Sequence, residues 1–472
     1  MSPMRRIPFD VLEQIFIACL PAHRNCVMSA QEAPVLLGRV CSSWRTLAFS
    51  APRLWSLLHI ALPNPDDSSA SRDVCAFKLA QRLEVASAWL GRSGNCPLSV
   101  SVERNVYTRS AAAFDTDAQD DVLELLVPYA SRWHDISLPI SSPGYKTLSE
   151  LSEDDVPLLR SLSLSLPDIN SEFTWSPSGI LHAVNLSRFE FAGGGVIPSG
   201  LPLRWNTLTH LSLKPSSWNT QQNLTCETAL DILSKCHALR RCQLLIQGVA
   251  EFQVLPTDVT IQSSLLRVFE LECYKTPIRT SEYLLNHFSH LELEEFSLVG
   301  SADWEDPDNI QDLTSALVRC PQLRSVVIQG DVFSRIFLAD LIRGLPSTVQ
   351  RLKMFCVRGW DDDSLDNDVL QVLEACADRP VGCPGLRQLI LQGVHLITDD
   401  ALLHFTVSRS PTLRLLDVTF SRERQVDILP NLQQFINAGL EISLRYPPRE
   451  PAFPQFSPWQ GLSDSPSHSL RH

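Results

Sequence analysis

A short apolar pattern recurs along the chain at intervals that are mostly 26 or 27 residues, and it constrains the fold more than any other feature of the sequence. Each copy has an apolar residue, two variable residues, a second apolar residue, one variable residue and a third apolar residue. The copies read WHDISL, LRSLSL, LSRFEF, LTHLSL, LRRCQL, LRVFEL, LEEFSL, LRSVVI, VQRLKM, LRQLIL, LRLLDV and, more weakly, GLEISL. Their fourth positions fall at residues 136, 162, 189, 211, 242, 269, 296, 326, 352, 389, 416 and 442, so seven of the eleven intervals are 26 or 27 residues. Apolar hexamers placed by chance would scatter far more widely, which indicates a repeat.

Helix-like stretches precede many copies of the pattern. VLELLVPYAS, ALDILSKCHA, DLTSALVRCPQ and DVLQVLEACAD each carry apolar residues at helical spacing. One strand and one helix per repeat, with this period, are typical of leucine-rich repeats. A single repeat cannot bury its own apolar residues, so the strands are expected to stack into a curved parallel sheet with the helices outside. The predicted fold class is therefore α/β, with a leucine-rich-repeat solenoid over residues 131–446.

The expected solenoid presents one face of its sheet to a partner. Since strand residues alternate, positions four and six of each copy should point into the core, while three, five and seven face the concave surface. An acidic group in the middle, flanked by a basic and aromatic section, would suit a partner with complementary patches. The alternative is an ordinary solvated sheet face. The candidate target-binding residues are Arg241, Glu270, Glu272, Glu295, Arg351, Lys353 and Phe355.

The N-terminal segment contains more apolar area than two short helices can bury against each other. IPFDVLEQIFIACL predicts a helix that begins near Pro8 and has an apolar stripe. EAPVLLGRVCSSWRTLAFS predicts a second helix that ends before Pro52. The spare apolar surface either packs on the rest of the chain or is the landing site of a partner.

Residues 7–55 closely resemble the F-box. IPFDVLEQIFIACL followed by LGRVCSSWRTLAFSAPRLW matches its Leu-Pro, acidic residue, apolar helix, Val-Cys-x-x-Trp-x-x-Leu and closing Leu-Trp. Ile7 and Asp10 replace the usual Leu and Glu, and the loop PAHRNCVMSAQEAP is unusually long and could alter how the helices meet. The resemblance implies docking on a Skp-type adaptor of a cullin-RING ubiquitin ligase. The residues it assigns to adaptor binding or its support are Pro8, Leu12, Ile15, Phe16, Leu20, Val40, Cys41, Trp44, Leu47, Leu54 and Trp55.

Residues 389–418 resemble the irregular, cysteine-containing leucine-rich repeats of many F-box proteins. An Ile-Thr-Asp sequence enters a helix there, and Thr398 or Asp399 is predicted to cap it. The pairing of an F-box with degenerate repeats also resembles the large F-box families of mushroom-forming fungi. The expected domains are an F-box over 1–60, a linker and entry or capping segment over 61–130, the solenoid over 131–446 and a Pro-rich tail without a fixed fold over 447–472.

Composition and motifs exclude several classes of function. A net charge of -13 argues against nucleic acid as a partner. No apolar run reaches the roughly 18–20 residues of a membrane span, and Asp10 and Glu13 interrupt the start where a signal peptide is apolar, so a cytoplasmic and/or nuclear location without membrane binding is expected. The thirteen cysteines include no CxxC, and neither the Cys236-His237-Cys242 group nor the Cys376 and Cys383 pair has a second pair at zinc-ligand spacing. Neither a metal nor another cofactor is expected.

The sequence also lacks the motifs of an enzyme. It contains no GxSxG, HExxH or phosphate loop and no evident Cys-His arrangement, so no catalytic residue is predicted. The leading expectation is the substrate-recognition subunit of a Skp-cullin-F-box ubiquitin ligase, whose solenoid holds a target for ubiquitin-dependent degradation. The alternatives are a protein-interaction scaffold that acts outside a ligase, and a hydrolase or transferase whose site is not evident.

Overall fold

The fold is described from a computed structural model of the whole chain. The described residues are 7–63, 69–104, 116–166, 175–194, 198–215, 223–247, 261, 265–274, 279–288, 292–300, 310–330, 333–356, 365–375, 381–410, 412–447, 457–459 and 462. They divide into two compact units, one formed by residues 1–196, 200–204 and 452–472 and the other by 197–199 and 205–451. Most of the tail predicted to lack a fixed fold lies outside the described residues, and so does Cys376.

Within each unit the strands follow one another in the order of the chain, β1 to β5 in the first unit and β6 to β14 in the second. Each described pair of neighbouring strands within a unit is parallel. The strands are β1 (Leu57–Leu62), β2 (Leu98–Arg104), β3 (Trp133–Pro139), β4 (Ser161–Ser165), β5 (Arg188–Gly193), β6 (His210–Pro215), β7 (Arg241–Gln247), β8 (Val268–Tyr274), β9 (Glu295–Gly300), β10 (Ser325–Gln329), β11 (Arg351–Phe355), β12 (Gln388–Val394), β13 (Leu415–Phe420) and β14 (Glu441–Arg445).

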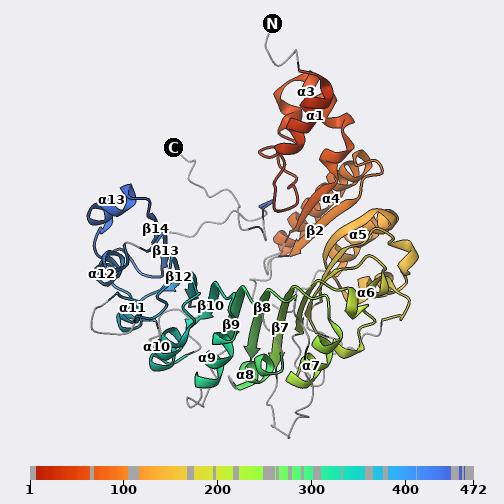
Figure 1. Cartoon of the computed structure of the whole chain (residues 1–472). Coiled ribbons are helices and arrows are strands. Elements are labelled where there is room, and N and C mark those ends of the chain that lie inside the picture. Colours follow the sequence, from red (N-terminus) through yellow and green to blue (C-terminus); the bar gives the residue numbers. More distant parts are fainter. Residues whose placement is uncertain are drawn as a thin grey trace. The chain divides into compact units, whose positions relative to one another are not determined.

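α-Helices lie between most consecutive strands, and short 3-10 turns lie between β4 and β5 and between β5 and β6; parallel neighbours need such crossover connections. In the second unit the strands follow a curve, and α7 to α13 lie on its outer side (Figure 1). The α-helices are α1 (Phe9–Ala18), α2 (Leu37–Val40), α3 (Ser42–Ser50), α4 (Ser69–Arg92), α5 (Thr116–Leu126), α6 (Ser142–Ser149), α7 (Cys226–Lys235), α8 (Arg279–Asn286), α9 (Ile310–Val318), α10 (Arg335–Gly344), α11 (Asn367–Val372), α12 (Asp399–Arg409) and α13 (Leu429–Asn437). The α/β repeat architecture expected from the sequence is therefore confirmed.

The register of the strands matches the repeat read from the sequence. Ile136 pairs with Leu162, and Leu389 pairs with Leu416, so fourth positions of consecutive copies lie side by side. The burial pattern follows the alternation expected of a sheet with one covered face, as in β6 and β13, where the second, fourth and sixth residues are buried. The last described strand differs, because Ile442 of β14 is only half-buried.

Two local features differ from the sequence analysis. The second N-terminal helix is not continuous: Cys41 is extended (φ -159°, ψ 171°) and separates α2 from α3. Ser42 and Ser43 follow it, and serine competes with the helix by local hydrogen bonding, which favours a new helix start there. The strand β1, just before the expected linker, escaped sequence analysis, because its buried run carries no copy of the repeat.

At the start of α12, one of the two predicted capping residues is confirmed. Thr398 is the N-cap residue, and its hydroxyl accepts a hydrogen bond from the Ala401 N–H at 3.2 Å. Asp399 is instead fully buried, and its carboxylate accepts hydrogen bonds from the Arg422 guanidinium at 2.8 Å and from the Tyr446 hydroxyl at 3.1 Å. Thr398 therefore caps the helix, whereas Asp399 forms buried hydrogen bonds with Arg422 and Tyr446.

Candidate protein-docking site

The N-terminal helical segment, residues 7–55, is built around a small apolar core. Phe16 of α1 is fully buried and packs on Trp44 of α3, with ring centroids 4.8 Å apart. Trp55, only 2% exposed, donates its indole N–H to the carbonyl oxygen of Ala48 at 2.7 Å. The Arg45 guanidinium ties α3 to α2 by donating to the Gly38 carbonyl oxygen at 2.8 Å. These contacts fix the helices relative to one another.

The same core continues into the first strands and α4. Trp55 meets Trp89 of α4 edge to face, with ring centroids 4.8 Å apart. The Arg92 guanidinium lies over the rings of Phe49 and Trp55, at 4.7 and 4.9 Å from their centroids. The helical segment is thus anchored to the residues that follow it by aromatic packing and by a cation-π contact.

The unusually long loop between the N-terminal helices is ordered on β1. Val27 forms a parallel bridge with His59, and the Cys26 carbonyl oxygen accepts a hydrogen bond from the His59 N–H at 2.8 Å. Inside the loop, Arg24 and Glu32 form an ion pair at 2.5 Å, and Glu32 also accepts a hydrogen bond from the Val27 N–H at 3.0 Å. The insertion therefore packs against the first strand of the sheet.

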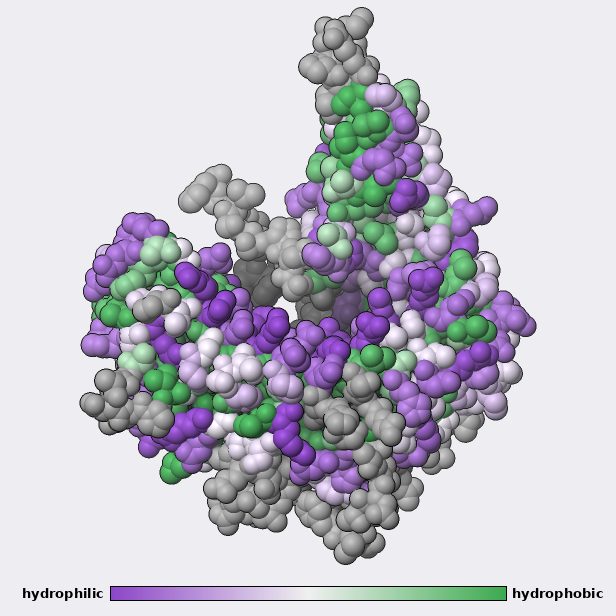
Figure 2. Space-filling model, in the orientation of Figure 1, coloured by the Kyte–Doolittle hydropathy of each residue, from purple (hydrophilic) through white to green (hydrophobic). Residues whose placement is uncertain are grey.

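An apolar face of this segment stays exposed. Val11 and Ile15 lie one turn apart on α1 and are 46% and 40% exposed. Leu36 and Val40 have the same spacing at α2 and are 43% and 57% exposed. Figure 2 shows hydrophobic side chains gathered over α1 and α3. We call Val11, Ile15, Leu36 and Val40 the apolar docking face.

The residues assigned by the F-box resemblance divide by exposure. Pro8, Ile15, Val40 and Cys41 are exposed, and Leu20 and Trp44 are half-buried. A side chain that is already buried supports a surface but cannot be its contact point. Phe9, Val11, Leu36 and Phe49 are exposed apolar residues that the sequence motif did not single out. The buried members of the assigned set are Leu12, Phe16, Leu47, Leu54 and Trp55.

The acidic group expected in the middle of the concave face is largely neutralised within the chain. Glu270 of β8 pairs with Arg241 of β7 at 3.0 Å, and Glu272 pairs with Lys214 of β6 at 3.4 Å. Among the described residues Glu295 of β9 has no ion-pair partner. The structure therefore leaves much less net negative charge here than the sequence indicated.

The basic and aromatic section lies on β11. Lys353 lies over the ring of Phe355, with Nζ 5.6 Å from the centroid, and both side chains are half-buried. Arg351 is exposed and, within the described part of the chain, makes no ion pair. These three predicted residues do share one face, as their alternation on the strand requires.

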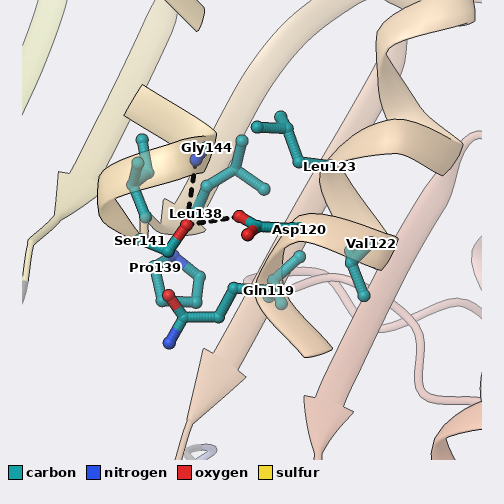
Figure 3. Close-up of a pocket in the computed structure, with 10 residues that line it drawn as sticks. Gln119, Asp120, Val122, Leu123, Leu138, Pro139, Ser141 and Gly144 are labelled. Carbon is teal, nitrogen blue, oxygen red and sulfur yellow. Dashed lines mark hydrogen bonds between the residues drawn. The ribbon is translucent and has the colours of Figure 1, made fainter. Parts of the chain in front are cut away.

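A small cavity lies where α5 and α6 approach β2 and β3 in the first unit (Figure 3). Ser141 donates a hydrogen bond to the Asp120 carboxylate and accepts one from the Gly144 N–H at 2.9 Å. The buried Gln119 Oε1 lies at the same place without a hydrogen-bond partner. The cavity volume is only about 10 Å³, close to that of a single water molecule, so it is too small for a metabolite.

Buried cysteines offer no reactive thiolate. Burial raises the pKa of the Cys26, Cys226, Cys236 and Cys383 thiols to about 12, so these groups are protonated at neutral pH. In the part of the chain that the structure describes, no group of three or more His, Cys, Asp or Glu side chains is arranged to hold a metal ion. No described helix is both long and apolar enough to cross a lipid bilayer. The surface features, rather than any cleft, are the candidate sites.

The parallel strands in chain order and the outer helices define an α/β repeat protein of the solenoid type. No known protein family matches the sequence, and no curated protein is similar to it in sequence. A comparison with solved structures returns, as a match, the crystal structure of the Rad7 and Elc1 complex in yeast. The identity is 14%, the match covers 75% of this chain and 74% of that chain, and the TM-score is 0.37.

Proposed function

We propose that this chain is the substrate-recognition subunit of a Skp-cullin-F-box type ubiquitin ligase. The observation that carries the proposal is the apolar docking face, which remains exposed although the helices that bear it have a packed core. Apolar side chains at one-turn spacing on consecutive helices are suited to a helical protein partner. The F-box resemblance of residues 7–55 supports a Skp-type adaptor as that partner.

The repeats supply the second half of the proposed function. A stacked parallel sheet offers an extended surface on which a target protein can bind. Holding that target next to a charged ubiquitin-conjugating enzyme raises its effective concentration, so the subunit needs no active site of its own. In this proposal the chain is a non-catalytic subunit.

A binding experiment with a purified Skp-type adaptor tests the first half directly. Ile15→Asp/Val40→Asp places two charges on the apolar docking face without touching the buried core. The variant should lose at least about tenfold in affinity, because a charge in an apolar interface is desolvated without a partner. The matched control is Ile336→Asp/Val407→Asp, since these residues are 74% and 47% exposed on α10 and α12 of the repeats.

Equal affinity of the wild type and the Ile15→Asp/Val40→Asp variant would remove this face from the adaptor interface. Absence of adaptor binding by the wild type would reject the proposal as a whole. A chain that binds the adaptor but never a cullin would instead favour a scaffold that acts outside a ligase.

A further inference from the structure

The carboxyl-terminal half of the second unit carries a row of arginines that the chain itself does not neutralise. Arg324 precedes β10, Arg351 begins β11, Arg387 precedes β12 and Arg414 precedes β13. All four are exposed, and none of them has an ion-pair partner among the residues that the structure describes. We call this set the arginine rim.

Backbone hydrogen bonds and the strand register place Arg324, Gln350, Arg387 and Arg414 in one row, with Arg351 one residue further along the chain at the start of β11. The Arg351 N–H donates to the Arg324 carbonyl oxygen at 2.9 Å, and the Arg414 N–H donates to the Arg387 carbonyl oxygen at 2.7 Å. Gln350 links the two pairs, because its carbonyl oxygen accepts the Arg387 N–H at 2.7 Å. The rim therefore crosses four consecutive strands, about 14 Å at a strand spacing of roughly 4.8 Å.

The carboxylates nearest in the sheet order do not cancel this charge. Glu294, before β9, lies 3.5 Å from the guanidinium of Arg267, and Asp417 of β13 is held by Arg445 at 2.7 Å. Beyond the rim, Glu295 begins β9 and Glu441 begins β14. Within the carboxyl-terminal half of the second unit, the unpaired arginines of the rim thus lie at the N-terminal ends of β10 to β13, and the glutamates of β8 are paired with Arg241 and Lys214.

We infer that the arginine rim binds an acidic, extended segment of a partner protein. Guanidinium groups form charge-assisted, bidentate hydrogen bonds with carboxylates, and the four arginines stand on neighbouring strands that together span about 14 Å. An extended segment advances about 3.3 Å per residue, so four or five residues span the rim. Lys353 lies next to the rim on β11 and adds a fifth cation.

A protein segment fits this surface better than a nucleic acid does. A nucleic acid strand carries charge along its whole length, so it would extend past the rim toward Glu295 and Glu441, in a chain whose net charge is -13. A short acidic segment ends where the positive charge ends. The inference concerns the repeats alone. Where the proposed function holds, the acidic segment belongs to the target of the ligase.

The test measures the affinity of the full chain for a peptide of alternating Glu and Ser, about ten residues long and labelled with an uncharged dye, by fluorescence anisotropy. Arg324→Ala/Arg387→Ala/Arg414→Ala should weaken binding at least about tenfold, and raising NaCl from about 0.05 M to about 0.2 M should weaken binding to the wild type. The control is Arg240→Ala. Arg240 holds the same repeat position before β7, is exposed and lies outside the rim.

A variant with reversed charge tests the inference even if the alanine variant loses little affinity for the peptide. Arg324→Glu/Arg387→Glu/Arg414→Glu should lose the Glu-Ser peptide and gain a Lys-Ser peptide of the same length. Unchanged affinity in the alanine variant, an equal loss in Arg240→Ala, or tighter binding of a single-stranded oligonucleotide of equal charge would overturn the inference. None of these results depends on adaptor binding, which the Ile15→Asp/Val40→Asp variant tests separately.

Discussion

At the scale of single residues, the two tryptophans of the N-terminal motif have different environments. Trp44 is half-buried and touches Phe16, so it can support the helices and still face a partner. Trp55 is 2% exposed, is hydrogen-bonded to Ala48 and packs on Trp89. The motif predicts the presence of both side chains, but only their packing distinguishes a contact residue from a structural one.

Trp55→Ala should therefore act on stability. Removal of a buried aromatic side chain leaves a cavity and an unpaired Ala48 carbonyl group, which should lower the free energy of unfolding by about 3–5 kcal/mol. Urea titrations followed by circular dichroism measure this change. Trp44→Ala is the comparison and should cost clearly less. A loss below about 1 kcal/mol for Trp55→Ala would show that this packing is absent in solution.

Asp399 makes the stability of the repeats depend on pH. Burial alone would raise the pKa of its carboxyl group, but hydrogen bonds from Arg422, Val426 and Gln425 together with the guanidinium charge hold it below its ordinary value. A lowered pKa in the folded state stabilises the fold fully above the unfolded-state pKa of about 3.9, and this contribution is lost as the pH falls through the folded-state value.

Asp399→Asn should lower the free energy of unfolding by about 3 kcal/mol at neutral pH, because it leaves the buried Arg422 cation without its carboxylate. The difference between the wild type and the variant should shrink below about pH 3.9, where the Asp399 contribution is being lost. Denaturant unfolding at several pH values measures both quantities. A difference that stays constant down to the acid limit would contradict this assignment.

At the scale of elements, the strands were the most predictable part of the fold. Their apolar positions recur with a fixed spacing, and residues such as Ile136 and Leu162 are indeed register partners. β1 was missed because it precedes the first copy of the repeat. The break at Cys41 was missed because apolar spacing continues through it, whereas the extended backbone depends on local capping.

The candidate sites were less predictable than the strands. Sequence alternation correctly places Arg351 and Lys353 on one face, but side-chain pairing decides which charges remain available. Glu270 and Glu272 are paired with cations of neighbouring strands, a contact between residues far apart in the chain. Exposure of Leu36 and Val40 likewise depends on how the helices pack and not on the motif itself.

The end of β12 depends on a glycine. Gly393 has φ +71°, and a Cβ at this position would lie 2.5 Å from the Cys356 carbonyl oxygen. Gly393→Ala should therefore lower the free energy of unfolding by more than the roughly 1–2 kcal/mol that a left-handed residue costs. Gly439→Ala is the matched control, since Gly439 has φ +99° but no neighbouring atom within 4 Å of its Cβ position. Equal losses of stability in the two variants would show that the close approach to Cys356 is relieved without cost.

At the scale of the whole molecule, the N-terminal helical segment is not separate from the strands that follow it. Val27 bridges to His59, Asn25 donates a hydrogen bond to Ser101 at 3.0 Å, and Trp55 packs on Trp89. The contacts with Ser101 and Trp89 cross the boundary at residue 60 that the sequence predicts for the F-box. The first compact unit accordingly includes residues well beyond that boundary.

A fragment of residues 1–60 should therefore not fold cooperatively by itself, since it lacks Trp89 and Ser101. Its far-ultraviolet circular dichroism should show little helix, and its thermal melt should be broad. A fragment of residues 1–204 retains these partners and serves as the control. A sharp transition in the shorter fragment would show that the helices are stable without the first strands.

The central claim is that the apolar docking face connects this chain to a ubiquitin ligase. The most direct measurement is purification of the tagged full chain from cells, as the wild type and as Ile15→Asp/Val40→Asp, followed by mass spectrometry of the retained proteins. The account predicts that a Skp-type adaptor and a cullin are retained by the wild type and lost by the variant, while proteins bound to the repeats are retained by both. A wild-type chain that retains neither an adaptor nor a cullin would contradict it.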